Sequence, residues 1–74
     1  MEKVLFKDWL CANYLKDSSY IGDLARDVSD DKTFPDEGSV DDFVSYIEKE
    51  GAVEEAVSVL MEAYDLYCQA QRQA

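Results

Sequence analysis

Hydrophobic residues recur along this chain at intervals of three and four positions, and alternation of the kind that marks a β-strand is rare. Such intervals bring side chains to one face of an α-helix, whose period is about 3.6 residues. The pattern therefore predicts four helices separated by short polar segments. The expected helices span about residues 2–14, 19–31, 39–50 and 53–71.

Each predicted helix has a defined apolar face. The first carries Phe6, Trp9 and Leu10, and we expect Trp9 in the core. The second and third each place four apolar residues at positions i, i+3, i+4 and i+7, namely Ile21, Leu24, Ala25 and Val28, then Val40, Phe43, Val44 and Ile47. The main stripe of the last helix comprises Val53, Ala56, Val57, Leu60, Tyr64, Tyr67 and Cys68. Packing this long helix across the three shorter ones would bury every face, which predicts an all-α compact four-helix bundle with a long C-terminal helix.

Residues suited to helix ends support these bounds. Ser18 or Ser19 is a candidate N-cap for the second helix. That helix should end around Asp30 or Asp31, because Pro35 disfavours a helical conformation at the residue before it.

The third and fourth helices have similar signals. Ser39 and Asp42 have the spacing of a capping box, with Asp in place of the usual Glu. Gly51 suits the left-handed conformation that often follows a helix. Glu54 and Glu55 suit the positive end of the last helix.

The length of 74 residues indicates one domain. A chain of this size is expected to be stable by about 4–11 kcal/mol. It leaves little room for a catalytic cleft with protected layers around it, which favours binding or structural work.

Acidic residues outnumber basic ones by 17 to 7, there is no histidine, and the net charge is −10. DNA and anionic membranes repel such a surface, since binding either normally requires a basic patch. The charge therefore disfavours direct DNA binding and membrane binding, and it favours a basic protein partner or simply solubility.

Cys11 and Cys68 lie within helical patterns and not in a spaced disulfide framework. Free thiols are the expectation, and a disulfide between the first and last helices is the less favoured alternative. The opening stretch "MEKVLFKDWLCANYL" lacks the apolar core of a signal peptide, and no apolar run approaches the length of a membrane span. We expect a cytoplasmic protein.

Catalysis is disfavoured by the residue types present. Without histidine there is neither an imidazole base nor a Cys–His pair. Asp23 and Asp27 fall opposite the apolar stripe of the second helix, so both should be hydrated, whereas a general acid needs to be desolvated. We expect no enzymatic activity, no catalytic residues and no cofactor.

The acid-rich stretch "DVSDDKTFPDEG" invites comparison with a calcium-binding loop. Counted from Asp27, position six is Lys32 and position twelve is Gly38. An EF-hand needs glycine and glutamate there. We therefore expect no metal site.

Nine acids and only two bases lie between Asp17 and Asp42. The candidate partner surface comprises Asp23, Asp27, Asp30, Asp31, Asp36, Glu37, Asp41 and Asp42. Three alternatives stay open: these acids only solvate the helix ends and loops; they imitate the phosphates of DNA, as in a phage or mobile-element inhibitor; or the protein binds nucleic acid through Lys3, Lys7 and Lys16. Tyr46 is expected to pack against the core with its hydroxyl in water.

Four segments occur in the order "FKDWL", "IGDLARDVSDDKTFP", "DDFVSYIEKEGA" and "AVSVLMEAYDLY". This order resembles the YozE-like family of small bacterial proteins, whose fold is similar to that of sterile alpha motif domains. The resemblance covers roughly Leu5 to Tyr67 and implies a compact helical bundle without assigning catalytic residues. It suggests that Phe34 inserts between the second and fourth helices while Pro35 redirects the chain.

Overall fold

The computed structural model describes residues 4–73. This part of the chain is all-α and contains four helices and no strand, the helices being α1 (Phe6–Tyr14), α2 (Tyr20–Asp30), α3 (Val40–Lys49) and α4 (Glu54–Gln73). The ends of α2, α3 and α4 lie within one or two residues of the predicted ends. Helix α1 begins later than predicted, because Leu5 has extended backbone angles, and the predicted start at Glu2 lies outside the described residues.

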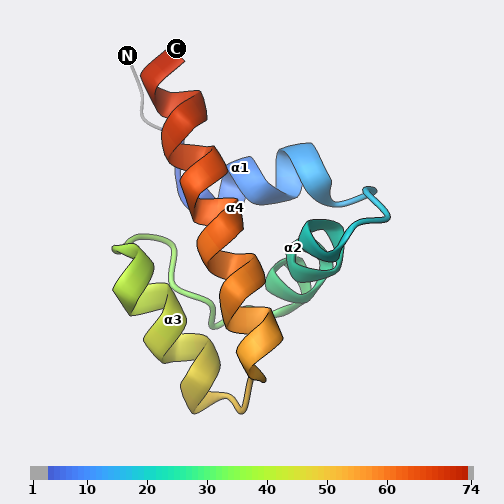
Figure 1. The fold of residues 1–74 in the computed structure, drawn as a ribbon, viewed down its shortest axis with the longest axis vertical. Coiled ribbons are helices and arrows are strands. Elements are labelled where there is room, and N and C mark those ends of the chain that lie inside the picture. The colour runs from blue at the N-terminus through green and yellow to red at the C-terminus, as the bar shows by residue number, and fades with distance from the viewer. Residues whose placement is uncertain (1–3, 74) are drawn as a thin grey trace.

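Helix α4 is the axis of the bundle (Figure 1). Its 20 residues span about 30 Å, close to the 35 Å length of the molecule. Helices α1 and α2 pack together and also contact α4, while α3 packs along α4. The predicted packing of a long last helix across three shorter ones is confirmed.

Phe6 on α1 lies at the centre of a cluster of aromatic side chains. Its ring centroid lies 5.1 Å from that of Phe43, 5.2 Å from that of Tyr64 and 5.5 Å from that of Tyr67. The remaining buried hydrophobic residues come from α1, α2, α4 and the loop before α3: Leu10, Leu24, Ala25, Val28, Phe34, Leu60 and Ala63. Trp9 is half-buried and packs against this core. The predicted apolar faces therefore meet in one cluster, as amphipathic helices require.

Val53 departs from the predicted pattern. It was placed on the main stripe of the last helix, but it lies outside α4, and 67% of its surface is exposed. The helical period does not apply to Val53, because α4 begins only at Glu54.

Phe34 is buried, as expected, with 4% of its surface exposed. It belongs to one core cluster with residues of α2 and α4, and both of its close aromatic partners lie on α3, a helix that the sequence did not predict as its neighbour. The ring stacks on Phe43 of α3 at 5.3 Å and meets Tyr46 of α3 edge-on at 5.5 Å. The loop after α2 is therefore fastened to α3, a helix that does not pack directly on α2.

Gly22 allows α2 to approach the end of α1 very closely. A Cβ atom at this position would lie 1.9 Å from the backbone oxygen of Asp17, which is far inside a van der Waals contact. The Ser19 hydroxyl caps the same turn by accepting a hydrogen bond from the Gly22 N–H at 3.3 Å, as predicted. Arg26 then donates from Nη1 to the backbone oxygens of Leu15 and Asp17. These contacts fix where α2 lies relative to α1.

Local signals at α3 are also confirmed. Ser39 and Asp42 form a reciprocal capping box, and Gly51 has a φ of +94°, the left-handed region predicted for it. Within residues 4–73, no helix has the length and hydrophobicity needed to cross a lipid bilayer.

Candidate partner-binding groove

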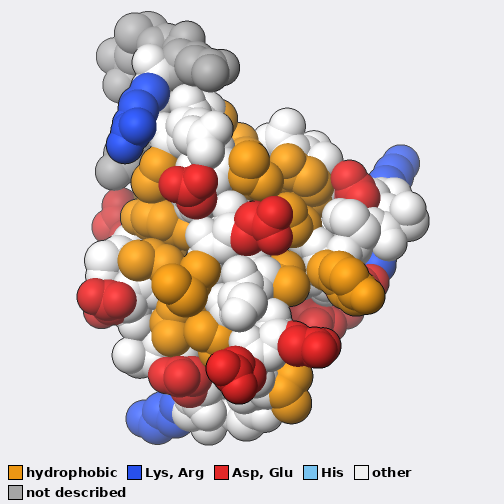
Figure 2. Space-filling model, in the orientation of Figure 1, with side chains coloured by type: hydrophobic (Ala, Val, Ile, Leu, Met, Phe, Trp, Pro, Cys, Tyr) orange, Lys and Arg blue, Asp and Glu red, His pale blue; other side chains and the backbone are white. Residues whose placement is uncertain are grey.

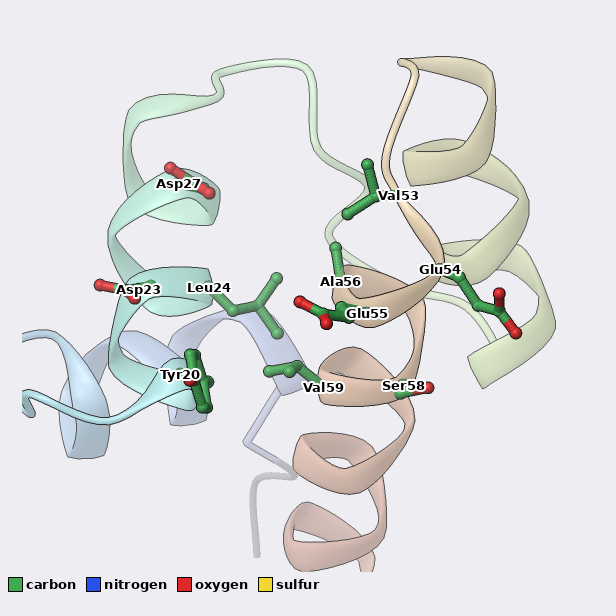
Figure 3. Close-up of a pocket in the computed structure, with 10 residues that line it drawn as sticks. All are labelled: Tyr20, Asp23, Leu24, Asp27, Val53, Glu54, Glu55, Ala56, Ser58 and Val59. Atoms are coloured by element: carbon green, nitrogen blue, oxygen red, sulfur yellow. The ribbon is translucent and has the colours of Figure 1, made fainter.

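A groove of about 600 Å³ separates the first two turns of α2 from the first two turns of α4. Residues from both helices and from the segment before α4 line it: Tyr20, Asp23, Leu24, Asp27, Val53, Glu54, Glu55, Ala56, Ser58 and Val59 (Figure 3). The contacts of Gly22 and Arg26 position the α2 wall, and the packing of α2 on α4 sets the width.

The floor of the groove is apolar. In Figure 3, Leu24 points from α2 toward α4, and Val59 points back from α4 toward α2. Tyr20 and Val53 lie at the margins, and they are the two most exposed large hydrophobic residues of the described chain, at 78% and 67%. Apolar surface left in water is a source of binding free energy for a partner that covers it.

Four acidic residues and no basic residue line the groove. In Figure 3 the Glu55 side chain projects from α4 toward α2, whereas the carboxylates of Asp23 and Glu54 point away from the space between the two helices. Asp23 forms an ion pair with Arg26. Among the described residues, no Lys or Arg lies within ion-pair distance of Asp27 or of the two glutamates. The groove is therefore a negatively charged site with an apolar floor.

Asp23 and Asp27 are the two members of the predicted acidic surface that line this groove. The lining residues that come from α4 and the segment before it were missed because they follow in the chain about thirty positions later. The pair Glu54 and Glu55 was interpreted only as a favourable charge at a helix N-terminus. Only the side-by-side packing of α2 and α4 reveals the shared site.

Asp31 is half-buried and has structural partners. Its carboxylate accepts hydrogen bonds from the Tyr46 hydroxyl at 2.6 Å and from the Thr33 hydroxyl at 2.8 Å. The bond from Tyr46, followed by those from Thr33, lowers the pKa of Asp31. The Tyr46 hydroxyl, which we expected in water, thus links α3 to the end of α2.

The other predicted acids lie around the loop between α2 and α3. Asp42 is held in the α3 capping box, and Asp36 lies 4.0 Å from the Nζ atom of Lys7. Asp30, Glu37 and Asp41 are exposed and do not line the groove. The predicted surface therefore divides into a groove part and a loop part.

In residues 4–73, the basic side chains that form ion pairs with acids are Lys7 and Arg26. Lys7 is the described lysine nearest to an acid, and Lys3 lies outside the described residues. On the face shown in Figure 2, acidic side chains are spread among hydrophobic ones, whereas basic side chains lie at the margins.

The other reactive groups do not assemble a site. Cys11 and Cys68 are free, half-buried thiols, and burial raises the pKa of Cys11 and makes its thiol less reactive. Across residues 4–73, no three Cys, Asp or Glu side chains come together in a way that could hold a metal ion.

Comparison with known proteins adds the family to this description. No curated protein and no solved structure matches the chain significantly. The model of the YozE SAM-like fold family matches residues 6–69, which include all but the last few residues of the four helices. This span confirms the resemblance carried by the sequence motifs and covers both walls of the groove, and the chain therefore belongs to the YozE SAM-like fold family.

Proposed function

We propose that this protein is a non-enzymatic interaction module that binds a basic protein partner in the groove between α2 and α4. The observation that carries the proposal is the composition of the groove, which joins apolar residues to four acidic residues without a lining Lys or Arg. Covering the exposed apolar surface of Tyr20 and Val53 supplies affinity, and the acidic residues select for positive charge.

The rest of the molecule supports a binding role over a catalytic one. The groove carboxylates are exposed, and a general acid normally needs desolvation to hold its proton at neutral pH. The net charge of −10 would also steer a basic partner toward the protein over a distance of about 10 Å at moderate salt.

Charge reversal at the groove tests this proposal. The double variant Asp27→Lys with Glu55→Lys changes one carboxylate on each wall. The control, Glu37→Lys with Asp41→Lys, makes the same change in net charge in the loop part of the acidic surface. Glu55 and Asp41 both lie in the first turn of a helix, so the two variants suffer a similar loss of favourable helix-end charge.

Affinity capture from a bacterial lysate at low salt should retain a basic protein on the parent and on the control variant, and lose it on the groove variant. Circular dichroism of all three proteins checks that the helices remain. Equal capture by both variants would show that the groove is not the binding site. Loss on the control alone would assign binding to the acids of the loop part and not to the groove.

Nucleic-acid binding is tested separately by a gel shift with duplex and single-stranded DNA. We expect no shift at low salt, since Lys7 lies beside Asp36 and the acids dominate the surface. A tight complex that weakens as salt is raised would overturn the proposed function.

A further inference from the structure

The dimensions of the groove restrict the kind of segment that fits it. Its α2 wall extends from Tyr20 to Asp27, which is about 10 Å along the helix axis, and its α4 wall from Glu54 to Val59 is slightly shorter. An extended strand would place only about three residues in such a length. A helix would place about seven, which is two turns. A helix therefore brings more side chains to this short site.

The backbone also favours a helical occupant. Residues 4–73 contain no β-strand, so this part of the chain has no sheet edge to which an extended peptide could add. Polyproline segments dock on surfaces rich in aromatic residues, whereas Tyr20 is the single aromatic residue of the groove lining. A helix satisfies its own backbone hydrogen bonds and needs only side-chain contacts from the two walls.

The charges of the groove define the occupant further. The N-terminal end of α4 would by itself attract an anion, but Glu54 and Glu55 place two negative charges in its first turn. Glu55 and Asp27 stand on opposite walls, with Leu24 between them and Val59 one turn further along α4. A helix lying between the walls would therefore meet apolar surface beneath and a carboxylate on each side.

We propose that the partner segment is an amphipathic basic helix of about two turns, a conclusion that rests on the function proposed above. Its aliphatic side chains, spaced three and four apart, seat on Leu24 and Val59. Lys or Arg side chains flanking that stripe pair with Asp27 and Glu55. Tyr20 and Val53, now exposed, close over its two ends. The contact is smaller than a standard protein interface, so the complex is weak and transient.

A pair of synthetic peptides tests the helical part of this inference. The first, of about 14 residues, carries Leu and Lys in a helical repeat, and the second has the same residues reordered to alternate. Binding is followed by fluorescence anisotropy and by backbone amide shifts of the isotopically labelled full-length chain. The helical peptide should shift amides of α2 and of the start of α4, and should bind at least about tenfold more tightly, or about 1.4 kcal/mol.

Variants of exposed groove residues test the location without endangering the fold. Tyr20→Ala and Val53→Ser should each weaken the helical peptide severalfold. Met61→Ala should leave its affinity unchanged, because Met61 is 53% exposed and does not line the groove. Asp27→Lys with Glu55→Lys should abolish binding at low salt, and Glu37→Lys with Asp41→Lys should preserve it.

The outcomes separate this inference from the proposed function. If both peptides bind in the groove equally well, the helical partner is wrong while the basic partner stands. If neither peptide shifts groove amides, or if the shifts fall only on the loop between α2 and α3, both proposals are overturned.

Discussion

Gly22 shows how one residue decides the relation between two helices. Alanine is favoured over glycine in a helix by about 1 kcal/mol, so propensity alone would make Gly22→Ala stabilising. The added Cβ would instead lie 1.9 Å from a backbone oxygen of the preceding turn, which is no flexible side-chain atom. Overpacking of this kind typically costs about 1–3 kcal/mol and sometimes more. Steric conflict therefore outweighs propensity at this position.

We predict that Gly22→Ala lowers the free energy of unfolding by about 1–3 kcal/mol, measured by urea denaturation. Gly51→Ala is the informative comparison, since nothing lies within 4 Å of a Cβ at Gly51 and only its φ of +94° opposes a side chain. That conformation costs alanine about 1–2 kcal/mol. The amide shifts of Gly22→Ala should change in both α1 and α2, whereas those of Gly51→Ala should change only near the α3–α4 turn. A Gly22→Ala protein as stable as the parent would show that the two helices separate freely.

The hydrogen bond between Tyr46 and Asp31 makes stability depend on pH at both ends of the scale. The bond lowers the pKa of Asp31 in the folded protein. Its contribution to the free energy of unfolding is therefore fully present above the ordinary carboxyl pKa of about 4, and it is lost as pH falls through the lowered pKa of Asp31. The bond also raises the pKa of Tyr46 in the folded protein. The same contribution to stability is therefore present below the ordinary tyrosine pKa of about 10, and it is lost as pH rises through the raised pKa of Tyr46.

Tyr46→Phe should therefore lower the thermal unfolding midpoint at neutral pH, and the difference from the parent should shrink in acid. Phenylalanine preserves the ring that meets Phe34 edge-on, so the comparison isolates the hydroxyl. Calorimetric scans at a series of pH values measure the difference. Tyr14→Phe is a control, because no hydrogen bond of the Tyr14 hydroxyl is present in the described structure. A difference that stays constant into strong acid would exclude the Asp31 carboxylate as the partner.

At the scale of elements, the loop between α2 and α3 is held by one aromatic side chain as well as by helix caps. Phe34 stacks on Phe43, whose ring is 5.1 Å from Phe6 in α1, so a residue outside any helix joins the central aromatic cluster. The stack ties the end of α2 to α3, although these two helices do not pack directly.

Phe34→Ala is expected to cost about 3–5 kcal/mol, the usual range for removal of a buried aromatic side chain. The expected total stability is about 4–11 kcal/mol, so the variant should be partly unfolded near 37 °C. Phe34→Leu, which keeps most of the buried apolar volume, should lose much less. Chemical denaturation of the three proteins measures the costs. An unfolding curve for Phe34→Ala that overlays the parent would contradict the burial of this ring.

At the scale of the whole molecule, like-charge repulsion outweighs ion pairing. The net charge is −10 on a body of 35 × 25 × 21 Å. Two ion pairs occur in the part of the chain that the structure describes, Lys7 with Asp36 and Arg26 with Asp23. Exposed pairs of this kind contribute about 0–1 kcal/mol each. Salt weakens both the repulsion between acids and the attraction within the ion pairs. Because unpaired acids outnumber the ion pairs, salt removes more repulsion than attraction.

We therefore predict that sodium chloride raises the thermal unfolding midpoint by several degrees between low salt and about 0.5 M, as the screening length falls to a few ångströms. The Glu37→Lys and Asp41→Lys control protein, which carries less net negative charge, should gain less. Scanning calorimetry at constant pH measures both. A midpoint that falls with salt would mean that ion pairs dominate the electrostatic free energy of this fold.

Residues a few positions apart in the chain are enough to predict the helices, their caps and the family. The spacing of Leu24, Ala25 and Val28 marks a helix face, and Ser39 with Asp42 marks a helix start, because both signals depend on residues a few positions apart. The sequence pattern placed Val53 inside the last helix because the spacing of apolar residues does not mark the first residue of a helix.

Which residues from distant parts of the chain become neighbours depends on how the helices pack together. Asp27 and Glu55 became opposite walls of one groove, Asp31 became a partner of Tyr46, and Phe34 became a neighbour of Phe43. Such pairs depend on the angles and distances at which helices pack, which are set by side-chain fit across the whole core and by close approaches such as that at Gly22. The spacing of residues within one helix does not predict those angles.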